Sequence, residues 1–186
     1  QVWVLSDQFG TTSSGHFTVN HASGSHAQIN DFAFSQSRLG PNERLRLSPY
    51  EGRSSDGALP MVNLDFPEDG GVLVGLGWSG QWLMDMARAD TGPLTVQAGM
   101  AHTHLRLYPG ERIRTPLVTL LFYQGPDFGR GQTFWRRLLR RHYTPTYDGK
   151  PQVPPIAAAP AIRFEDMDEQ NMLANIAALQ TNGLDV

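Results

Sequence analysis

Two tryptophans flank a Ser-Gly pair in the stretch GGVLVGLGWSGQWLMD, and they are candidates for binding a sugar. Trp78 and Trp82 stand at the two ends of a bend at Ser79-Gly80, where their indole rings can form an aromatic wall. The C–H-rich faces of a sugar ring stack well on such a surface. Tryptophan also fills the core of β-sandwich proteins, so the sequence leaves open whether these rings meet a ligand or pack inside.

A second candidate site lies in the loop YEGRSSDGALP, residues 50–60. Arg53 and Asp56 stand between two glycines, together with two serines, so one permissive loop presents a guanidinium, hydroxyls and a carboxylate. Hydroxylated ligands are bound by such mixed donors and acceptors. We therefore take Arg53 and Asp56 as candidate substrate-binding residues. A turn closed by its own serine and Arg–Asp contacts would show the same sequence.

Two histidines, His102 and His104, are spaced like the first ligands of a metal site on one face of a strand. The carboxylate that such a site needs does not follow at a suitable spacing, because Glu111 comes late. The sequence therefore predicts a pair of surface histidines and no metal. The earlier histidines, among them His26, fit no single strand face and are interpreted as loop polarity.

The sequence contains no complete catalytic set. The motifs that mark a serine nucleophile elbow, a zinc-protease helix or a phosphate-binding loop are absent. Paired carboxylates for glycoside hydrolysis must face each other across a cleft. The acidic cluster at 165–169 stands instead at a predicted helix start, where a favourable interaction with the helix dipole explains it. We therefore assign no catalytic residue and no cofactor to this chain.

The overall charge and composition exclude some classes of partner. The formal net charge is −3, so no broad cationic surface attracts nucleic acid. The arginines in FWRRLLRRHY are expected to form the solvated face of a helix. The absence of cysteine excludes disulfides and thiolate metal ligands, and no apolar stretch is long enough to predict a membrane-spanning helix. The compartment stays open, because many secreted proteins lack disulfides.

The elements that position these residues are predicted to be short strands. The sequence is 40% apolar and 18% charged, with 19 glycines and 13 prolines, a composition that favours strands joined by many turns. Apolar residues alternate at a spacing of two in successive segments, which predicts an antiparallel β-sandwich. The predicted strands are QVWVL, HFTVN, AQINDFAFS, ERLRLSPY, LPMVNLDF, VLVGLGW, QWLMDMAR, LTVQAGM, HTHLRLY and TPLVTLLFY.

The pattern changes in the last third of the sequence. In TFWRRLLRRHY, apolar or aromatic residues recur at i, i+3, i+4 and i+7 opposite four arginines, which predicts a short amphipathic helix. A proline-rich linker follows over 144–159, and then PAIRF is predicted to be a short strand. Asp166 with Glu169 resembles a capping box at the start of a helix. This helix is predicted to bury one apolar stripe and to end before LDV. The predicted domains are a β-sandwich over 1–143, the linker, and the first β/α step of a parallel barrel over 160–186.

Five stretches taken together resemble glycoside hydrolase family 36, the α-galactosidase group. They are GRSSDGALP, GLGWSGQW, LYPGERIRTPLV, FWRRLLRRHYTP and DMDEQNMLANIAALQTNGLDV, in this order. The resemblance runs from about residue 50 to the end of the chain. Its more specific parts are WSGQW and PGE-x-I-x-TP, whereas AAAPAIRFEDM lacks the tryptophan that the first barrel strand of relatives brings near the sugar.

The resemblance implies a large N-terminal β-sandwich followed by a (β/α)₈ barrel that hydrolyses terminal α-galactosides with two aspartates and retention of configuration. The chain is then the latter part of the sandwich, the linker and the first barrel step, and both catalytic aspartates lie beyond it. WSGQW and GRSSD would help to wall a sugar pocket in the same subunit or, in a homo-oligomer, in a neighbouring one. The implied partners are a galactoside substrate and the rest of the barrel. A stand-alone carbohydrate-binding β-sandwich is the alternative.

Overall fold

The structure, a computed structural model, describes residues 1–10, 16–26, 28–66, 70–151 and 167–183. The chain divides into two compact units, Gln1–Leu138 and Leu139–Val186. The predicted barrel strand PAIRF, the terminal LDV and much of the predicted linker lie outside the described residues. None of the described helices is both long and apolar enough to cross a membrane.

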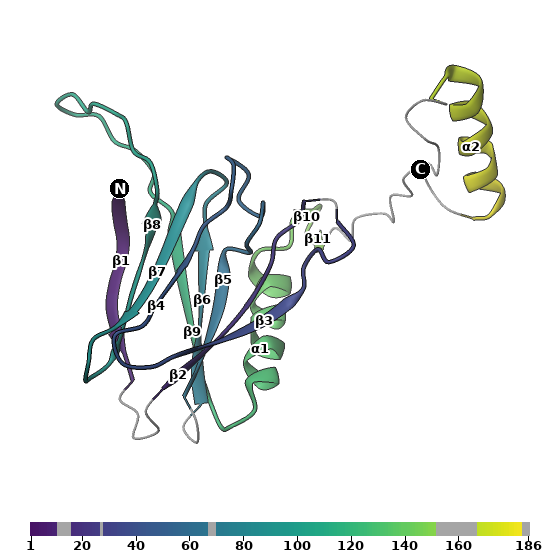
Figure 1. The fold of residues 1–186 in the computed structure, drawn as a ribbon. Helices are drawn as coiled ribbons and strands as arrows, with labels where there is room; N and C mark the ends of the chain where they lie inside the picture. The colour runs from purple at the N-terminus through teal and green to yellow at the C-terminus, as the bar shows by residue number, and fades with distance from the viewer. Residues whose placement is uncertain (11–15, 27, 67–69, 152–166, 184–186) are drawn as a thin grey trace. The chain divides into compact units, whose positions relative to one another are not determined.

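The first unit is built from nine described strands in two antiparallel sheets (Figure 1). The strands are β1 Val2–Phe9, β2 Phe17–Ala22, β3 Phe34–Leu39, β4 Arg44–Leu47, β5 Met61–Phe66, β6 Gly70–Gly77, β7 Trp82–Arg88, β8 Leu94–Met100 and β9 Leu117–Gln124. One sheet has the order β3-β2-β5-β6-β9, and the other has the order β1-β8-β7-β4. The predicted antiparallel β-sandwich is confirmed.

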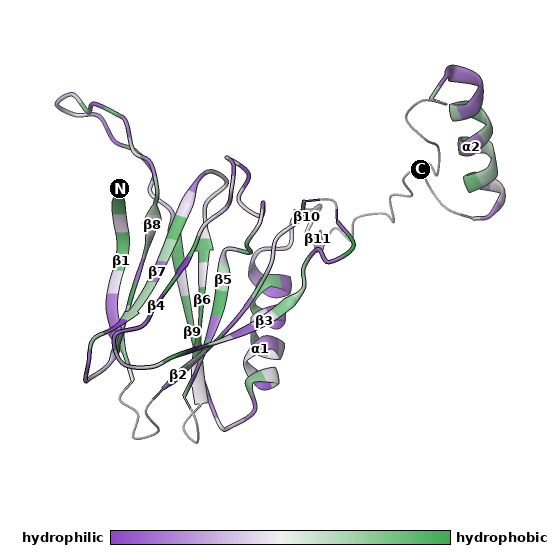
Figure 2. Ribbon diagram, in the orientation of Figure 1, coloured by the Kyte–Doolittle hydropathy of each residue, from purple (hydrophilic) through white to green (hydrophobic). Residues whose placement is uncertain are grey.

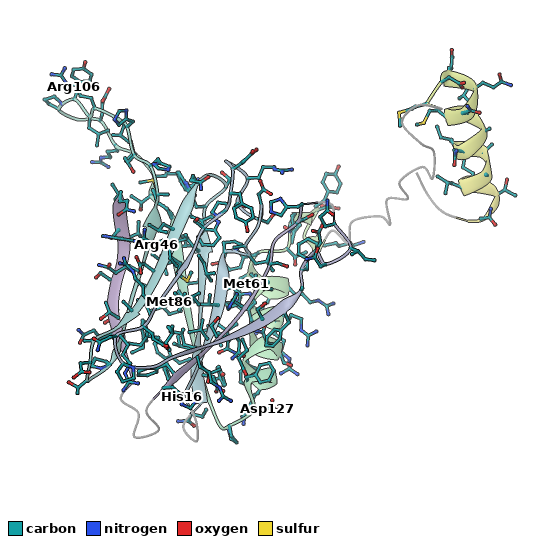
Figure 3. The ribbon with its side chains drawn as sticks, viewed as in Figure 1. His16, Arg46, Met61, Met86, Arg106 and Asp127 are labelled. Carbon is teal, nitrogen blue, oxygen red and sulfur yellow. The ribbon has the colours of Figure 1, made fainter. Side chains whose placement is uncertain are left out.

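Alternate residues of the two sheets form one core. Trp82, Met84 and Met86 of β7 are fully buried, and Val72 and Val74 of β6 belong to the same cluster from the other sheet. Figure 2 shows the apolar bands along these strands, and Figure 3 labels Met86 within them. The residues that enter this core follow the period of two that predicts the strands, although most of the residues between them on β6 and β7 are buried as well. Each such side chain stabilises the fold by about 1.5–3 kcal/mol.

Helix α1, Phe128–His142, packs on the outer face of the five-stranded sheet. Glycines permit this close approach. A Cβ atom at Gly75 of β6 would collide with the ring of Trp135, and one at Gly131 would lie 2.5 Å from the ring of Tyr123. The strand β6 is therefore buried on both faces, which explains why small and large residues alternate along it.

Two strands differ from their predictions. HTHLRLY is not a strand, because the segment 101–116 between β8 and β9 is irregular and projects from the sheets, with Arg106 at its far end (Figure 3). The neighbours β1 and β7 already pair with both edges of β8, and Leu105 and Tyr108 in the segment are exposed. In AQINDFAFS the strand begins only at Phe34, because turns precede it.

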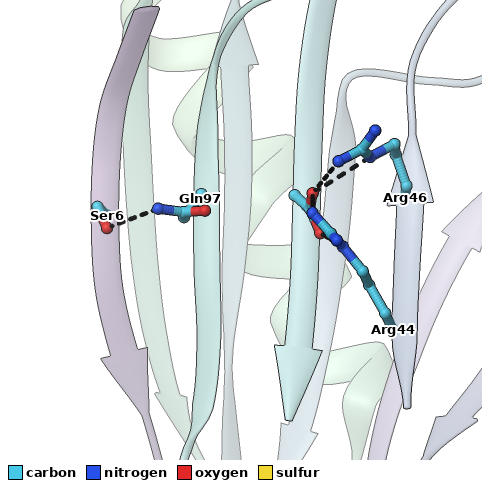
Figure 4. A network of polar contacts seen from close by, with 5 residues as sticks. Ser6, Arg44, Arg46 and Gln97 are labelled. Carbon is cyan, nitrogen blue, oxygen red and sulfur yellow. Dashed lines mark hydrogen bonds and ion pairs between the residues drawn. The ribbon is translucent and has the colours of Figure 1, made fainter. Parts of the chain in front are cut away.

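A polar row crosses the four-stranded sheet on its outer face (Figure 4). Asp85 of β7 is almost completely buried, and Arg44 and Arg46 of β4 both donate hydrogen bonds to its carboxylate. On the adjacent strands, the side-chain amide of Gln97 donates to the hydroxyl of Ser6 at 3.2 Å. Burial alone raises the pKa of Asp85, but the hydrogen bonds and charges of the two arginines outweigh burial and hold that pKa below its ordinary value.

Replacing Asp85 with asparagine is expected to lower the free energy of unfolding by about 1–2 kcal/mol at neutral pH. The folded-state pKa lies below the ordinary value of 3.8, so the contribution of the carboxylate is present above that value and is lost as the pH falls through the folded-state pKa. Urea unfolding at neutral pH and near pH 3 checks this. The difference between the wild-type chain and Asp85→Asn should shrink at the lower pH, and an unchanged difference would contradict the ionic role.

The second unit contains a small hairpin and a second helix. Strands β10, Thr146–Tyr147, and β11, Lys150–Pro151, are joined by Asp148 and Gly149, which have φ angles of 50° and 72°. Positive φ at both positions is the geometry of a tight hairpin turn. The predicted linker thus begins with a hairpin.

The N-cap of helix α2, Glu169–Thr181, lies two residues after the predicted capping residue Asp166. Its N-cap is Asp168, whose Oδ1 accepts a hydrogen bond from the backbone N–H of Asn171 at 2.7 Å, whereas Asp166 lies outside the described residues. No residue of α2 is buried. Of its predicted apolar stripe, Leu173 is exposed, and Met172, Ile176 and Leu179 are only partly buried.

Candidate functional site

Four segments meet at one end of the sandwich: the loops 23–33 and 48–60, the bend 78–81 and the start of 101–116. The backbone N–H of Ser25 donates a hydrogen bond to the carbonyl of Ser55 at 2.8 Å, which joins the two loops. The side chain of Gln81 donates to the carbonyl of Pro49 at 2.6 Å, and its own carbonyl accepts from Ala101 at 3.1 Å. The fold thus brings both predicted site motifs to the same end of the molecule.

Asp56 is the buried centre of the loop 48–60. Its side chain is only 3% exposed, and its carboxylate lies 2.8 Å from Nδ1 of His26 and 3.2 Å from Nη2 of Arg53. A buried carboxylate needs such partners, because burying it alone costs several kcal/mol. Asp56 therefore holds the loops together, while the guanidinium of Arg53 remains largely exposed to solvent. The self-contained Arg–Asp contact that the sequence left open is present.

An aromatic surface lies beside these charges. The ring of Tyr50 stacks on the imidazole of His26 with 4.8 Å between centroids and an interplanar angle of 23°. Gly57 has a φ of +86°, and a Cβ atom there would collide with the ring of Tyr50. Tyr50 is nevertheless 74% exposed. One end of the loop therefore offers an open phenol ring and the Arg53 guanidinium, groups that bind hydroxylated ring ligands.

Trp82 lies in the core between the two sheets. Its side chain is 0% exposed, so neither face of its indole ring is open to a ligand in the described structure. The indole Nε1 donates a hydrogen bond to the carbonyl of Ser54 at 2.6 Å. Trp82 is the first residue of β7 and its side chain alternates with Met84 and Met86 into the core. It anchors the loop that carries Arg53 and Asp56.

Trp78 differs from Trp82 because it is only half-buried. Part of its ring packs against the core, and the residue also lines a cavity of about 270 Å³. Arg114, Thr115 and Ser79 line the same cavity. An indole ring next to a guanidinium and two hydroxyls supplies both the apolar surface and the donors that a sugar requires. The binding role of Trp78 stays a prediction.

The described carboxylates do not form an acid–base pair at this end of the molecule. Asp56 is held by His26 and Arg53, and none of the described aspartates and glutamates lines the cavity at Trp78. Asp65 lies on the outer face of β5, near the end that is remote from the loop 48–60, and burial raises its pKa. The described residues contain no group of three or more side chains that could hold a metal ion. The arrangement can bind a ligand, but it shows no catalytic pair.

Two residues of this region were missed by the sequence analysis. His26 was interpreted as loop polarity, although its imidazole contacts Asp56 and Tyr50. Arg114 lies 36 positions after Trp78 in the sequence and approaches it only because the segment 101–116 returns to the sheet. Local spacing carries no signal for such contacts, because they join segments that are distant along the chain.

Known structures share this fold. The chain matches a substituted α-galactosidase AgaA of glycoside hydrolase family 36 from Geobacillus stearothermophilus, in complex with stachyose, over 97% of its length at 20% identity and a TM-score of 0.63. Structures of AgaA variants with raffinose and with 1-deoxygalactonojirimycin each match 69% of the chain at 21% identity and a TM-score of 0.51. No family model matches the sequence, and no curated protein matches it either.

The chain spans only a part of these α-galactosidases. It covers 25% of the AgaA variant bound to stachyose and 18% of those bound to raffinose and to 1-deoxygalactonojirimycin. At about one residue in five identical, the match establishes a shared fold. A shared fold at this identity does not establish a shared function.

Proposed function

We propose that the chain is the accessory β-sandwich portion of a glycoside hydrolase of α-galactosidase type. The whole protein would hydrolyse terminal α-galactosides by a retaining mechanism with two aspartates that lie beyond this chain. The observation that carries the proposal is the match to AgaA over 97% of the chain at a TM-score of 0.63. The sandwich would support a barrel that the helix α2 begins.

Within this role, the end of the sandwich at which the loops 23–33 and 48–60, the bend 78–81 and the start of 101–116 meet would contact the substrate. We refer to it as the loop-rich end. Trp78 would stack on one sugar ring, and Arg53 would donate hydrogen bonds to hydroxyl groups. Asp56 and Trp82 would act indirectly, because both are buried and hold the loop 48–60 in place. The AgaA variants were solved with raffinose and stachyose, which supports a galactoside as the ligand. The loop-rich end would face the sugar in the same subunit or in a neighbouring copy.

Raffinose binding tests the cavity at Trp78. Replacing Trp78 or Arg114 with alanine is expected to weaken raffinose binding roughly tenfold, because each change removes a wall of the cavity. Arg112→Ala is the matched control, since Arg112 is an exposed arginine of the same segment outside the cavity lining. Isothermal titration or NMR chemical shifts give the affinity. If Arg114→Ala and Arg112→Ala bind raffinose with equal affinity, the cavity at Trp78 is not the raffinose site.

Hydrolysis assays test whether the catalytic activity requires the barrel as well as the sandwich. The chain by itself is expected to show no turnover of a chromogenic α-galactoside, because the described residues offer no carboxylate pair in a cleft. A longer protein that continues into the barrel should be active. If the longer protein binds raffinose and has no activity, the stand-alone carbohydrate-binding sandwich becomes the better assignment. Turnover by the chain alone after stringent purification would contradict both.

A further inference from the structure

A groove lies on the outer face of the five-stranded sheet, between α1 and β3. It has a volume of about 260 Å³. Its floor is formed by outward-facing residues of β2 and β5, its helix side by Phe128 and Gln132, and its β3 side by Phe32 and Phe34. Helix α1 covers β6 next to it, where Trp135 packs on Gly75. The groove is therefore the part of this sheet face that α1 leaves open.

The walls of the groove are aromatic and exposed. The rings of Phe34 and Phe128 are nearly parallel, with 6.0 Å between centroids and an interplanar angle of 20°. Phe34 is 58% exposed and Phe128 is 38% exposed. Phe32 adds a third exposed ring, held at the rim by a backbone φ of 59°. Three exposed phenyl rings around one groove form an apolar surface that a ligand would cover.

The floor carries amide groups that are almost completely buried. Asn20 and Asn63 face each other across β2 and β5, and their side chains donate one hydrogen bond each, to the carbonyls of Asn63 and Phe128 at 3.4 Å. Both side-chain oxygens already accept hydrogen bonds, from Gln36 and Tyr123. Each amide nitrogen has two N–H groups and uses one of them among the described residues. The second is available to a ligand hydroxyl.

The groove is electrically neutral. Among the residues that the structure describes, no aspartate, glutamate, lysine or arginine lines it. His21 is the one ionisable residue of this described lining, and burial lowers the pKa of its imidazole, which favours the neutral form. A phosphate, a carboxylate or an ammonium group would find no countercharge there. The lining therefore fits a neutral ligand that has an apolar face and hydroxyl groups at its edge.

The size of the groove restricts the ligand further. Pockets for drug-sized molecules begin at about 300 Å³, and the groove lies just below that limit. It is too small for a helix of another protein, and the floor strands β2 and β5 are each paired on both sides, so the floor offers no free strand edge to a peptide. A single six-membered ring fits these limits.

We propose that this groove binds one neutral hexopyranose ring, with Phe34 and Phe128 as its apolar wall and the amides of Asn20 and Asn63 as its donors. The site goes beyond the function proposed above. Phe32 and Leu59 come from the loops 23–33 and 48–60, but the groove includes neither Arg53 nor Asp56 and shares no lining residue with the cavity at Trp78. It would hold a sugar unit apart from any catalytic centre.

NMR titration of the 186-residue chain with D-galactose, and separately with raffinose, tests the groove. Backbone amide signals of Ala22, Asn63 and Gln132 are expected to shift and saturate, with a dissociation constant on the order of 1 mM. The variant Phe34→Ala should weaken this response roughly fivefold. Phe122→Ala is the matched control, because Phe122 is an exposed phenylalanine of the same sheet that does not line the groove, and it should stay within about twofold of the wild-type chain.

A second variant keeps the test decisive if Phe34→Ala folds poorly. Ala22→Leu adds bulk to the floor without removing any ring, and it should also abolish the saturating shifts. Three results would overturn the proposal: no saturation at the groove signals, equal affinity of Phe34→Ala and the wild-type chain, or shifts that depend on protein concentration without sugar. The last would identify a second copy of the chain as the occupant.

The two sites can fail separately. Trp78→Ala should leave the groove response unchanged, because Trp78 does not line the groove. A groove that responds while the signals around Trp78 stay silent would reject the sugar contact at the loop-rich end and keep the groove. The reverse pattern would reject the groove alone. Displacement of galactose by cyclohexanol at equal concentration would show that the groove is an apolar site without sugar recognition. This result would also reject the proposal for the groove.

Discussion

Replacing Trp82 with alanine is expected to lower the free energy of unfolding by about 3–5 kcal/mol, one of the two largest effects of any single substitution considered for this chain. The indole is completely buried among Met84, Met86 and the facing sheet, so its removal leaves a large cavity in the core. The loss also frees the carbonyl of Ser54, which accepts a hydrogen bond from Nε1 at 2.6 Å. Urea unfolding monitored by circular dichroism measures the change.

Trp82→Phe separates these two contributions. Phenylalanine retains much of the buried ring but has no N–H donor, so the expected loss is about 1–2 kcal/mol, mostly from the hydrogen bond to the loop 48–60. In this variant the amide signals around Arg53 and Asp56 should shift, while those at the far end of β8, near Leu94, stay in place. If Trp82→Ala destabilises the chain by less than about 1 kcal/mol, the tryptophan is not in the core, and its role as a surface ligand contact would return.

Replacing Trp135 with alanine is expected to cost a similar amount, about 3–5 kcal/mol. Trp135 is the large buried side chain of α1, and its ring rests directly on Gly75 of β6. Its indole N–H has no hydrogen-bond partner among the described residues, so packing is the source of its contribution. Thermal unfolding and hydrogen exchange of the outer sheet face measure the loss. Exchange should increase at Leu73 and Gly75, beneath the helix.

The glycine under this ring gives a sharper test through a double-mutant cycle. Gly75→Ala should destabilise the wild-type chain by about 1–3 kcal/mol, because the new Cβ atom would collide with the indole. In the Trp135→Ala background the same change should be almost neutral. Gly77→Ala is the control, since a Cβ atom there would meet the nearest atom at an ordinary 3.4 Å. Additive effects of Gly75→Ala and Trp135→Ala would show that α1 does not pack as described.

Much of the sheet architecture follows from the sequence pattern. The alternation in QWLMDMAR and LTVQAGM corresponds to the residues of β7 and β8 that enter the core between the sheets, because side chains in a strand point to opposite faces in turn. Burial itself does not alternate along β7, where nearly every residue is buried. The same rule fails for HTHLRLY. Alternation shows which residues would face a core, but it cannot show whether a neighbouring strand is available to pair with the segment.

The candidate site was only partly predictable. The loop with Arg53 and Asp56 and the bend with Trp78 stand out by composition, and the structure places both at one end of the sandwich. The structure separates these four residues, because Asp56 and Trp82 are buried while Arg53 and Trp78 have exposed surface. Side chains of the same type and the same sequence neighbourhood differ here according to which face of the strand or loop they occupy.

The sequence by itself determined the fold class, since strand periodicity, turn residues and the glycines of β6 are local properties of the chain. Only the tertiary structure decided which tryptophan is a core residue, that His26 and Arg53 share Asp56, and that Phe34 and Phe128 form one groove. Phe34 and Phe128 are separated by most of the sandwich in sequence. Contacts of this kind depend on how strands and helix pack, and packing is a property of the whole folded chain.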